Sequence, residues 1–373
     1  MGLIKRVKQI IVNRRQRVIN GKVNCIPTPI PEFRYDFPGP EQGTYYLVSG
    51  GAKSSKTKIT NFLFLFNSIL YAYHNPEKVR LRVFYSLLEE TAENITMKFM
   101  CYLLFRLSGH KIRIDIKTLK SVDEHRIVSP EIIELLDSPE YQSILDFFEE
   151  HITFVPDRNP TGIYNTIEAY AEEHGTTYKK PAKIKNKETG EYEDKMVFDY
   201  YEPDDPDEYV LCIVDHVSLI STERGMDLRE SINKLSEYMK ILRNKYNYTP
   251  VIVQQQNSET LSLDAYKANK IRPTQKGCAD SQCPPKDCDI MLGITSPYAF
   301  GIENYQKYNI TKLKSYCRFL EVVLGRDGES NAVIGLYFDG ATGYYSALPK
   351  WNDSENLEKK YQLIQRIQES ISK

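Results

Sequence analysis

The sequence predicts an α/β fold: a mostly parallel, twisted sheet with helices on both faces and an antiparallel edge. Three observations predict it. Short runs of continuous apolar residues alternate with helical patterns along most of the chain, which is typical of parallel strands buried on both faces. A late pair of strand patterns has no helix between its members, and this favours an antiparallel edge. The length of 373 residues is sufficient for a large core.

The first predicted element is a basic amphipathic helix in residues 1–22. This stretch carries seven basic residues and no acidic ones, and its apolar residues between Leu3 and Val18 recur at helical spacing before Gly21 ends the pattern. Such a helix can contact a membrane, a nucleic acid or another protein, and docking on a protein surface is the interpretation that we favour. The proline-rich connector that follows, residues 25–43, cannot continue the helix.

Strands and helices then alternate. Apolar runs rich in β-branched and aromatic residues predict strands at 44–48, 79–88, 152–155, 209–217, 250–255, 289–294, 320–326 and 332–338. Helical spacing of apolar residues predicts helices at 57–74, 91–107, 162–173, 228–246 and 357–371. The polar stretch 176–208 interrupts this alternation, and its segment NKETGEYE resembles a hairpin turn. We therefore expect a surface insertion there, folded as a hairpin or partly disordered.

Composition limits the class of protein. The net charge of −1 means that any nucleic-acid site must be local. An odd number of cysteines, seven, indicates a reducing compartment rather than a disulfide framework. Neither a membrane-spanning stretch nor a secretory signal is recognisable, so we expect a cytoplasmic protein that does not bind membranes. Cys278, Cys283 and Cys288 recur every five residues without a nearby histidine, a spacing that does not favour zinc.

The segment SGGAKSSKTKIT, Ser49–Thr60, lies between a predicted strand and a predicted helix, as a phosphate-binding loop requires. It matches the signature G-x-x-x-x-G-K-[ST] except at Ser55, which replaces the second glycine. In such a loop backbone N–H groups bind phosphate oxygens, the lysine reaches the β- and γ-phosphates, and the next hydroxyl binds Mg²⁺. The predicted ATP-binding residues are Gly50, Gly51, Ser54, Ser55, Lys56 and Thr57. The alternative is a plain turn of small residues.

Carboxylates follow two of the other predicted strands. Asp215 ends an apolar strand, where together with Thr57 it can hold the Mg²⁺ that bridges the phosphates. Glu89 and Glu90 follow another strand, where a carboxylate can orient or deprotonate the attacking water, and we assign Glu90 to the first turn of the next helix. In the alternative interpretation, each of these carboxylates only caps the element that follows it.

Two further groups complete the predicted site. Gln254, Gln255 and Gln256 end a core strand, where an amide can hydrogen-bond a γ-phosphate or its water, unless it belongs to a solvated strand end. Arg326 follows a late strand, and in a ring of subunits it can reach the γ-phosphate of a neighbour as an arginine finger. The alternative for Arg326 is an ordinary surface arginine.

In this order, the motifs resemble those of the ATPase domain of DnaB-type replicative helicases, which has a RecA-like fold. The resemblance runs from about residue 24 to 343 and includes SLLEETAENITMKF, LCIVDHVSLI, PVIVQQQN, RPTQKGCADSQCPPKDCDIMLGI and EVVLGRDGESNAVIGLYF. It implies that Glu89 is the catalytic glutamate, that Gln255 is the amide that senses the γ-phosphate, and that Arg326 is the finger. It also implies a homo-hexameric ring, ATP and Mg²⁺ as cofactors, and a primase or helicase loader as a further partner.

The resemblance implies that single-stranded DNA runs through the channel of the ring, along two loops with basic residues. These residues are Arg224 in the first loop and Lys267, Lys270, Arg272 and Lys276 in the second. For each of them the alternative is a solvated surface charge. The chain also departs from the family. Leu324 stands where a lysine is frequent, and residues 279–282 read ADSQ where Arg-Glu-Ser-Gly is frequent, which leaves the details of strand binding open.

On this interpretation, residues 1–22 form a linker helix that packs on the neighbouring subunit, 23–350 a RecA-like ATPase domain with the insertion 176–208, and 351–373 a C-terminal helix. The leading hypothesis is an ATP-driven DNA helicase that moves 5′–3′ on single-stranded DNA. One alternative is another RecA-like ATPase, a recombination or repair motor that does not unwind. The other is a ring or adaptor protein that binds nucleotide weakly because of Ser55.

Overall fold

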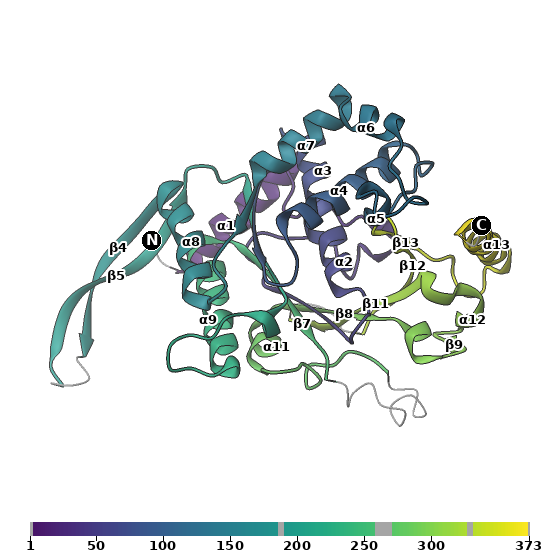
Figure 1. Ribbon diagram of the computed structural model, residues 1–373. Coiled ribbons are helices and arrows are strands. Elements are labelled where there is room, and N and C mark those ends of the chain that lie inside the picture. Colours follow the sequence, from purple (N-terminus) through teal and green to yellow (C-terminus); the bar gives the residue numbers. More distant parts are fainter. Residues whose placement is uncertain (1–2, 186–189, 258–270, 327–330, 372–373) are drawn as a thin grey trace.

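A single sheet organises the protein. The computed structural model describes residues 3–185, 190–257, 271–326 and 331–371 (Figure 1). The nine-stranded sheet has the spatial order β13 (Tyr344–Ala347), β12 (Val333–Asp339), β11 (Cys317–Gly325), β8 (Ile290–Thr295), β1 (Tyr46–Gly50), β7 (Thr249–Gln255), β6 (Glu208–Asp215), β2 (Arg80–Leu87) and β3 (Ile152–Val155). Strands β8 to β3 in this order pair parallel, whereas β11, β12 and β13 pair antiparallel. The predicted parallel sheet with an antiparallel edge is confirmed.

Helices cover one face of the sheet above the central strands. They are α2 (Lys56–Thr60), a π-helical segment (Asn61–Phe66), α3 (Asn67–His74), α4 (Ala92–Leu107) and α7 (Pro139–His151). The first three are continuous and form the helix expected at 57–74. Aromatic side chains fill the space between the helices, as in the stacked pair Phe99–Phe148, whose ring centroids lie 4.5 Å apart. This burial of large apolar side chains stabilises the layer.

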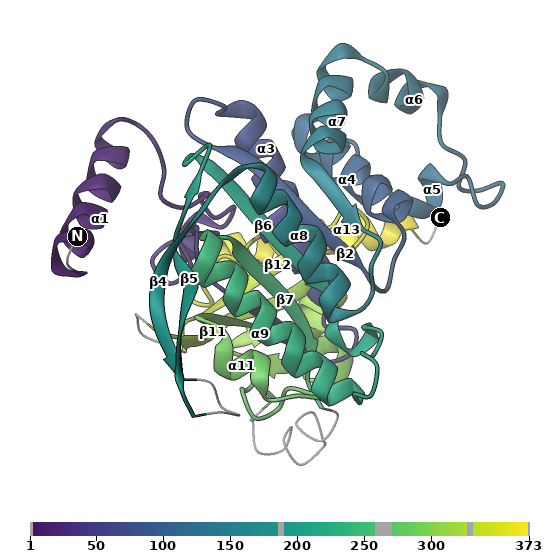
Figure 2. The same cartoon turned by 90° about the vertical axis from the view of Figure 1, so that its left-hand side faces the viewer.

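The opposite face of the sheet carries α8 (Pro160–Glu173) and α9 (Leu228–Tyr246), which lie in front of the sheet in Figure 2. Ile163 and Ile167 of α8 and Leu235 and Met239 of α9 are fully buried in a second core cluster. A capping box at Asp227 starts α9 by satisfying free backbone N–H groups. The sheet is therefore covered on both faces, as its continuous apolar strands predict.

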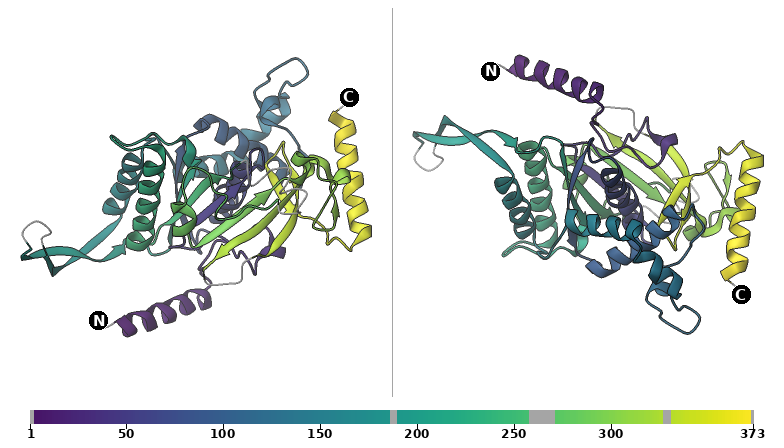
Figure 3. Two further views of the ribbon diagram at one scale, coloured as in Figure 1. Left: turned by 90° about the horizontal axis from the view of Figure 1, so that it is seen from below. Right: turned by 90° about the horizontal axis from the view of Figure 1, so that it is seen from above.

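The insertion forms a long hairpin of β4 (Gly175–Lys185) and β5 (Tyr192–Pro203), which projects from the domain (Figures 1 and 3). The remaining elements are short: η1 (Pro31–Phe33), α5 (Ile116–Leu119), α6 (Pro130–Leu136), η3 (Val217–Leu219), α11 (Cys283–Asp287), η5 (Pro297–Phe300), β9 (Asn304–Tyr305), β10 (Tyr308–Asn309), α12 (Ile310–Leu313) and η6 (Lys314–Tyr316).

Several of the elements between residues 108 and 151 are not among those expected from the sequence, and neither is β13. The helix α7 has a clear pattern, because Tyr141, Ile144 and Phe148 are buried at helical spacing after a proline at its start. The signal for α7 was therefore present in the sequence. The elements α5 and α6 have no buried residues and gave no such signal.

The two terminal helices differ in how they are packed. The C-terminal helix α13 (Ser354–Ile371) buries Leu357 and Ile364 in a small core cluster with α12, as its apolar stripe predicts. The N-terminal helix α1 (Leu3–Ile19) stands apart from the sheet (Figure 2), and Ile4 and Ile11 are 69% and 61% exposed. In the part of the chain that the structure describes, ion pairs such as Arg17–Asp207 attach the C-terminal half of α1. Within the described ranges, no helix has the length and hydrophobicity needed to cross a membrane.

Candidate active site

The predicted phosphate loop connects β1, near the middle of the sheet, to the first turn of α2. At its start, Gly50 pairs with Gln255 of β7 on one side and with Ile294 of β8 on the other. A Cβ atom added to Gly50 would lie 2.5 Å from the backbone oxygen of Ile294, so only glycine fits between these strands. The loop thus lies at the carboxyl edge of the parallel strands, where open α/β sheets bind ligands.

Ser55 has the backbone conformation that explains the glycine of the signature. It immediately precedes α2 with φ 76° and ψ 35°, in the left-handed region. Glycine adopts this conformation freely, whereas for other residues it costs about 1–2 kcal/mol. The Ser55 hydroxyl accepts hydrogen bonds from Nη2 and Nε of the buried Arg318, at 3.0 and 3.2 Å. Ser55, which replaces the glycine of the signature, is therefore contacted by an arginine that is distant in the chain.

Two other polar side chains of the loop, Lys56 and Ser54, differ in their surroundings. Lys56 folds back over the loop, and its Nζ donates to the backbone oxygen of Gly51 at 3.1 Å. Burial lowers the pKa of Lys56, and the charges of Asp215 and Glu89 oppose this effect. The hydroxyl of Ser54 is buried and has no hydrogen-bond partner among the described residues. The Lys56 ammonium can donate three hydrogen bonds, so it retains donors for a bound anion besides its contact with Gly51.

Asp215 ends β6, beside the loop, and is buried to 4% exposure. Its Oδ2 accepts a hydrogen bond from the Tyr85 hydroxyl at 3.4 Å, whereas its Oδ1 has no partner among the described residues. Burial raises the pKa of Asp215 to about 6, the nearby Thr57 hydroxyl opposes this, and the charges of Glu89 and Glu90 add to it. A void of about 10 Å³ lies between these residues, the size of one water or ion. The unsatisfied oxygen, the neighbouring hydroxyl and the void fit a Mg²⁺ ion.

The two adjacent glutamates have different surroundings. Glu89 lies just beyond the end of β2, its side chain is 51% exposed, and its carboxylate is 3.9 Å from Nε2 of His216. Glu90 forms an ion pair with Lys98 of α4. The Glu90 carboxylate is thus held by the following helix, whereas that of Glu89 is accessible at the site. His216, directly after Asp215, is a site residue that the sequence interpretation missed.

The three glutamines at the end of β7 also differ. Gln254 donates to the backbone oxygens of Ala279 and Ser281, and Gln256 exchanges hydrogen bonds with Thr274, so both support the backbone of 271–281. Gln255 points to the opposite side of the strand, pairs with Gly50 through the backbone and is only partly buried. Its backbone lies beside the start of the phosphate loop, and its sensing role stays a prediction.

Arg326 lies far from this site in its own chain. It follows β11, which runs antiparallel to β8, so it lies at the edge of the sheet opposite to the phosphate loop. Its guanidinium donates to the backbone oxygens of Cys288 and Lys286, at 3.0 and 2.8 Å, and its side chain is 45% exposed. Arg326 cannot act on a nucleotide bound to the loop of the same subunit.

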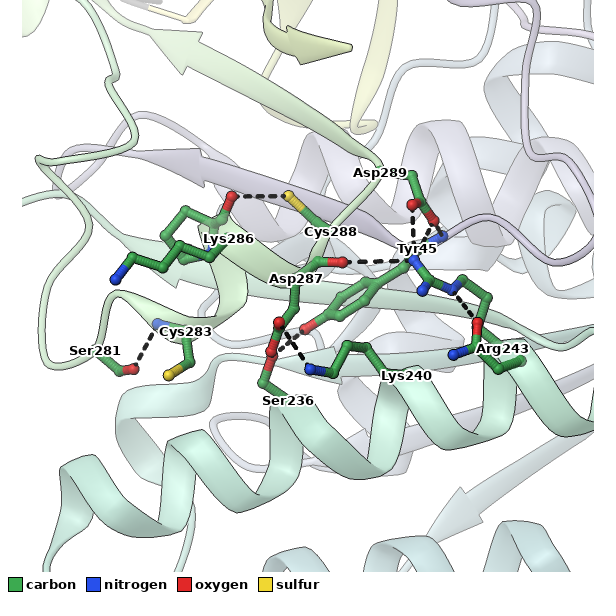
Figure 4. Close-up of polar contacts among 12 residues, drawn as sticks. Tyr45, Ser236, Lys240, Arg243, Ser281, Cys283, Lys286, Asp287, Cys288 and Asp289 are labelled. Carbon is green, nitrogen blue, oxygen red and sulfur yellow. Dashed lines mark hydrogen bonds and ion pairs between the residues drawn. The ribbon is translucent and has the colours of Figure 1, made fainter. Parts of the chain in front are cut away.

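Asp287 and Asp289 lie just before β8, and both make contacts that stabilise the fold (Figure 4). Asp289 forms an ion pair with Arg243 at 2.7 Å and accepts the backbone N–H of Tyr45 at 2.9 Å. Asp287 accepts hydrogen bonds from Ser236 and Lys240. These carboxylates attach α9 to β1 and β8. In the same region Cys288 is buried, which raises the pKa of its thiol well above the usual range.

The predicted DNA-binding residues are distributed over two loops that contact each other through Ser218 and Asp280. Arg224 and Lys276 are exposed on these loops. Arg272, in contrast, forms an ion pair with the buried carboxylate of Glu321, so its charge is neutralised within the chain. The remaining two, Lys267 and Lys270, lie outside the described residues.

A cavity of about 1110 Å³ opens beside Lys58 of α2, the residue that follows the phosphate loop. Its wall is strongly basic and contains Lys58, Lys98, Arg113, Lys117, Arg126 and Arg318, together with the carboxylate of Asp115. Arg113 and Lys98 are ion-paired, with Asp339 and Glu90 respectively. The cavity has the size and charge to accept a part of a phosphorylated ligand.

Comparisons with known proteins show that the fold of this chain is a known one. No family model matches the sequence, and no curated protein matches it either. Among solved structures, the ATPase domain of G40P is similar with a TM-score of 0.62 and 13% identity, over 94% of this chain and 100% of that domain. A DnaB-like replicative helicase, described with its interactions with primase, is similar with a TM-score of 0.58 and 12% identity. That match covers 91% of this chain and 65% of the helicase chain. At such identities the likeness shows the fold alone, which this chain shares with the ATPase domain of G40P and with the DnaB-like helicase.

Proposed function

We propose that this protein is an ATP-dependent DNA helicase that acts as a hexameric ring on single-stranded DNA. One observation carries the proposal: in a fold shared with helicase ATPase domains, the phosphate loop, Asp215 and Glu89 meet at one edge of the sheet. This edge has the chemistry of a nucleoside triphosphatase, with N–H donors, an ammonium group and two carboxylates. Translocation in the 5′–3′ direction is part of the proposal and rests on the family resemblance.

In the proposed reaction, each residue has one role. The backbone N–H groups of 51–55 and the Lys56 ammonium bind the phosphates, and Thr57 with Asp215 would hold Mg²⁺. When bound, the ion neutralises charge on the phosphate oxygens. Glu89 orients the attacking water and accepts its proton, and the amide of Gln255 hydrogen-bonds the γ-phosphate. The cavity beside Lys58 would accommodate a part of ATP beyond the phosphates that the loop binds.

The arginine finger is proposed to act between subunits. The position of Arg326 at the sheet edge opposite to the phosphate loop supports this, because a head-to-tail ring brings opposite sides of neighbouring subunits together. Such a finger stabilises the negative charge that develops during phosphoryl transfer. In the ring, Arg224 and Lys276 would contact DNA phosphates in the channel. A primase or a helicase loader is the proposed protein partner.

The proposal predicts ATP hydrolysis that needs Mg²⁺, is stimulated by single-stranded DNA and separates a forked duplex. The measurement is phosphate release with and without an oligonucleotide, beside the release of a fluorescent strand from the fork. Protein without nucleotide, and with a nonhydrolysable analogue, serves as the control. Absence of hydrolysis would eliminate both enzyme hypotheses and leave the nucleotide-binding adaptor. Hydrolysis without strand separation would instead indicate a motor that does not unwind.

The exposed apolar stripe of α1 supports the proposed role of this helix as a linker between subunits. Ile4, Val7, Ile11 and Val18 lie on one side of the helix, and all are at least 44% exposed. A helix with such a stripe gains stability only when the stripe is covered. Its attachment to its own chain through Arg14 and Arg17 would leave the stripe free to pack on a neighbour.

We predict that Ile4→Ser combined with Ile11→Ser abolishes hexamers in Mg²⁺ and ATP, because two exposed apolar contacts are lost from each interface. Multi-angle light scattering measures the assembly. Gln9→Ser with Asn13→Ser, two exposed polar residues on the other side of α1, is the matched control and should assemble normally. Hexamers that persist in the isoleucine variant would refute the linker role of α1.

A further inference from the structure

The phosphate loop contains a serine at a left-handed position, and the chain places a buried cation against it. Arg318 is the second residue of β11, and its side chain is 6% exposed. No carboxylate in the described part of the chain pairs with it, and burial lowers its pKa. A buried charge without a counter-ion is costly, so its presence calls for a role that offsets this cost.

The nitrogen atoms of the Arg318 guanidinium donate hydrogen bonds in two directions. Nη1 donates to the backbone oxygens of Ser315 and Cys317, at 3.0 and 2.7 Å, which anchors the side chain to its own strand. Nε and Nη2 point to the phosphate loop, where they donate to the hydroxyl of Ser55 and, at 3.1 Å, to the backbone oxygen of Ser54. The guanidinium also lies over the ring of Phe338, 4.4 Å from its centroid. Arg318 is therefore rigidly held and directed at two consecutive loop residues.

These contacts affect the conformation of the loop because serine lacks the conformational freedom that glycine has at this position. Glycine needs no help to reach φ 76°, whereas serine disfavours it. Two hydrogen bonds from a fixed guanidinium to the serine hydroxyl favour the one conformation in which that hydroxyl faces Arg318. The hydroxyl of Tyr345 adds a weaker contact, at 3.5 Å, to the backbone oxygen of Ser55.

We infer that Arg318 is a positioning residue of the nucleotide site: through the hydroxyl of Ser55 it holds the phosphate loop in the conformation that binds phosphates. The Ser55–Arg318 pair takes the place of the usual glycine. This role concerns the contacts of Arg318 with the loop, and it is separate from the position of Arg318 in the wall of the basic cavity. This inference rests on the proposed function, since it assigns the loop to nucleotide binding.

The test compares the wild type with Arg318→Met, Ser55→Gly and the double variant. Arg318→Met should weaken binding of a fluorescent ATP analogue by about 5- to 30-fold, the range that corresponds to the usual cost of a left-handed residue. Ser55→Gly should bind as tightly as the wild type or more tightly. The double variant should bind within about 3-fold of Ser55→Gly, because glycine no longer needs the guanidinium. Equal losses in the serine and the glycine backgrounds would overturn the inference, because a role in core packing or through charge alone predicts them.

Two further measurements keep the test decisive. If Arg318→Met does not fold, Ser55→Ala removes the hydroxyl and retains Arg318, and it should bind more weakly than both the wild type and Ser55→Gly. Wild-type affinity in Ser55→Ala would overturn the inference. Hydrogen exchange of the amides of residues 54–56 in the nucleotide-free protein gives a readout that does not need ATP. Arg318→Met should accelerate this exchange in the serine background only; an unchanged rate contradicts the inference even if the proposed function fails.

Discussion

Glu89→Gln is expected to lower kcat for ATP hydrolysis by about 10³-fold while nucleotide affinity stays within about 3-fold of the wild type. The amide retains the shape of the side chain but cannot accept the proton of the attacking water. Since Glu89 lies beyond the end of β2 and its side chain is half exposed, its substitution should leave the fold of the loop intact. Phosphate release and the Kd of a fluorescent ATP analogue separate the two effects.

Glu90→Gln is the matched control, because it changes the adjacent residue in the same way. This variant loses the ion pair with Lys98 of α4, a contact with the following helix, and should retain kcat within about 10-fold. An inactive Glu90→Gln beside an active Glu89→Gln would mean that the two assignments must be exchanged. If both variants remain active, the water is activated by another group, and His216 would be the first to examine.

Much of the fold follows from the sequence because most strands of the nine-stranded sheet are largely apolar. A run such as YVLCIVD can be stable only when both faces of the strand are covered, and this requirement alone predicts the layers above and below β6. The position of the candidate site also follows from the sequence. Loops after parallel strands meet at one edge, so the phosphate loop and the residues after β2, β6 and β7 are brought together by topology.

What could not be predicted depends on contacts between residues that are distant in the chain. Ser55 and Arg318 are separated by 263 positions, so the sequence showed only a missing glycine and not its partner. Likewise, Arg272 is a basic loop residue in the sequence, whereas in the structure its charge is neutralised by Glu321. Such pairs are set by the register of β11 beside β8, which no local pattern specifies.

The other large effect concerns Asp215, whose substitution should separate stability from activity. The folded protein raises the pKa of this carboxyl from 3.8 to about 6, chiefly because it is buried. Between these two pH values the folded state binds more protons than the unfolded state, so stability falls as pH rises through this window. Above pH 6 the full penalty, about 3 kcal/mol, opposes folding of the nucleotide-free protein. A site that must bind Mg²⁺ thus stores a buried negative charge at the expense of stability.

We therefore predict that Asp215→Asn raises the melting temperature of the nucleotide-free protein at pH 8, and that this gain disappears as pH falls toward 4. In Mg²⁺ and ATP the order reverses, because only the wild type gains stability from the ligand, and kcat/KM of the variant falls on the order of 10³-fold. Scanning calorimetry over this pH range measures the first effect. Asp289→Asn is the control: it leaves the partly buried Arg243 without its carboxylate partner, so it should lower the melting temperature with or without nucleotide. A destabilised Asp215→Asn at pH 8 would show that the unpaired oxygen of Asp215 supports the fold, which contradicts a site that is built for a cation.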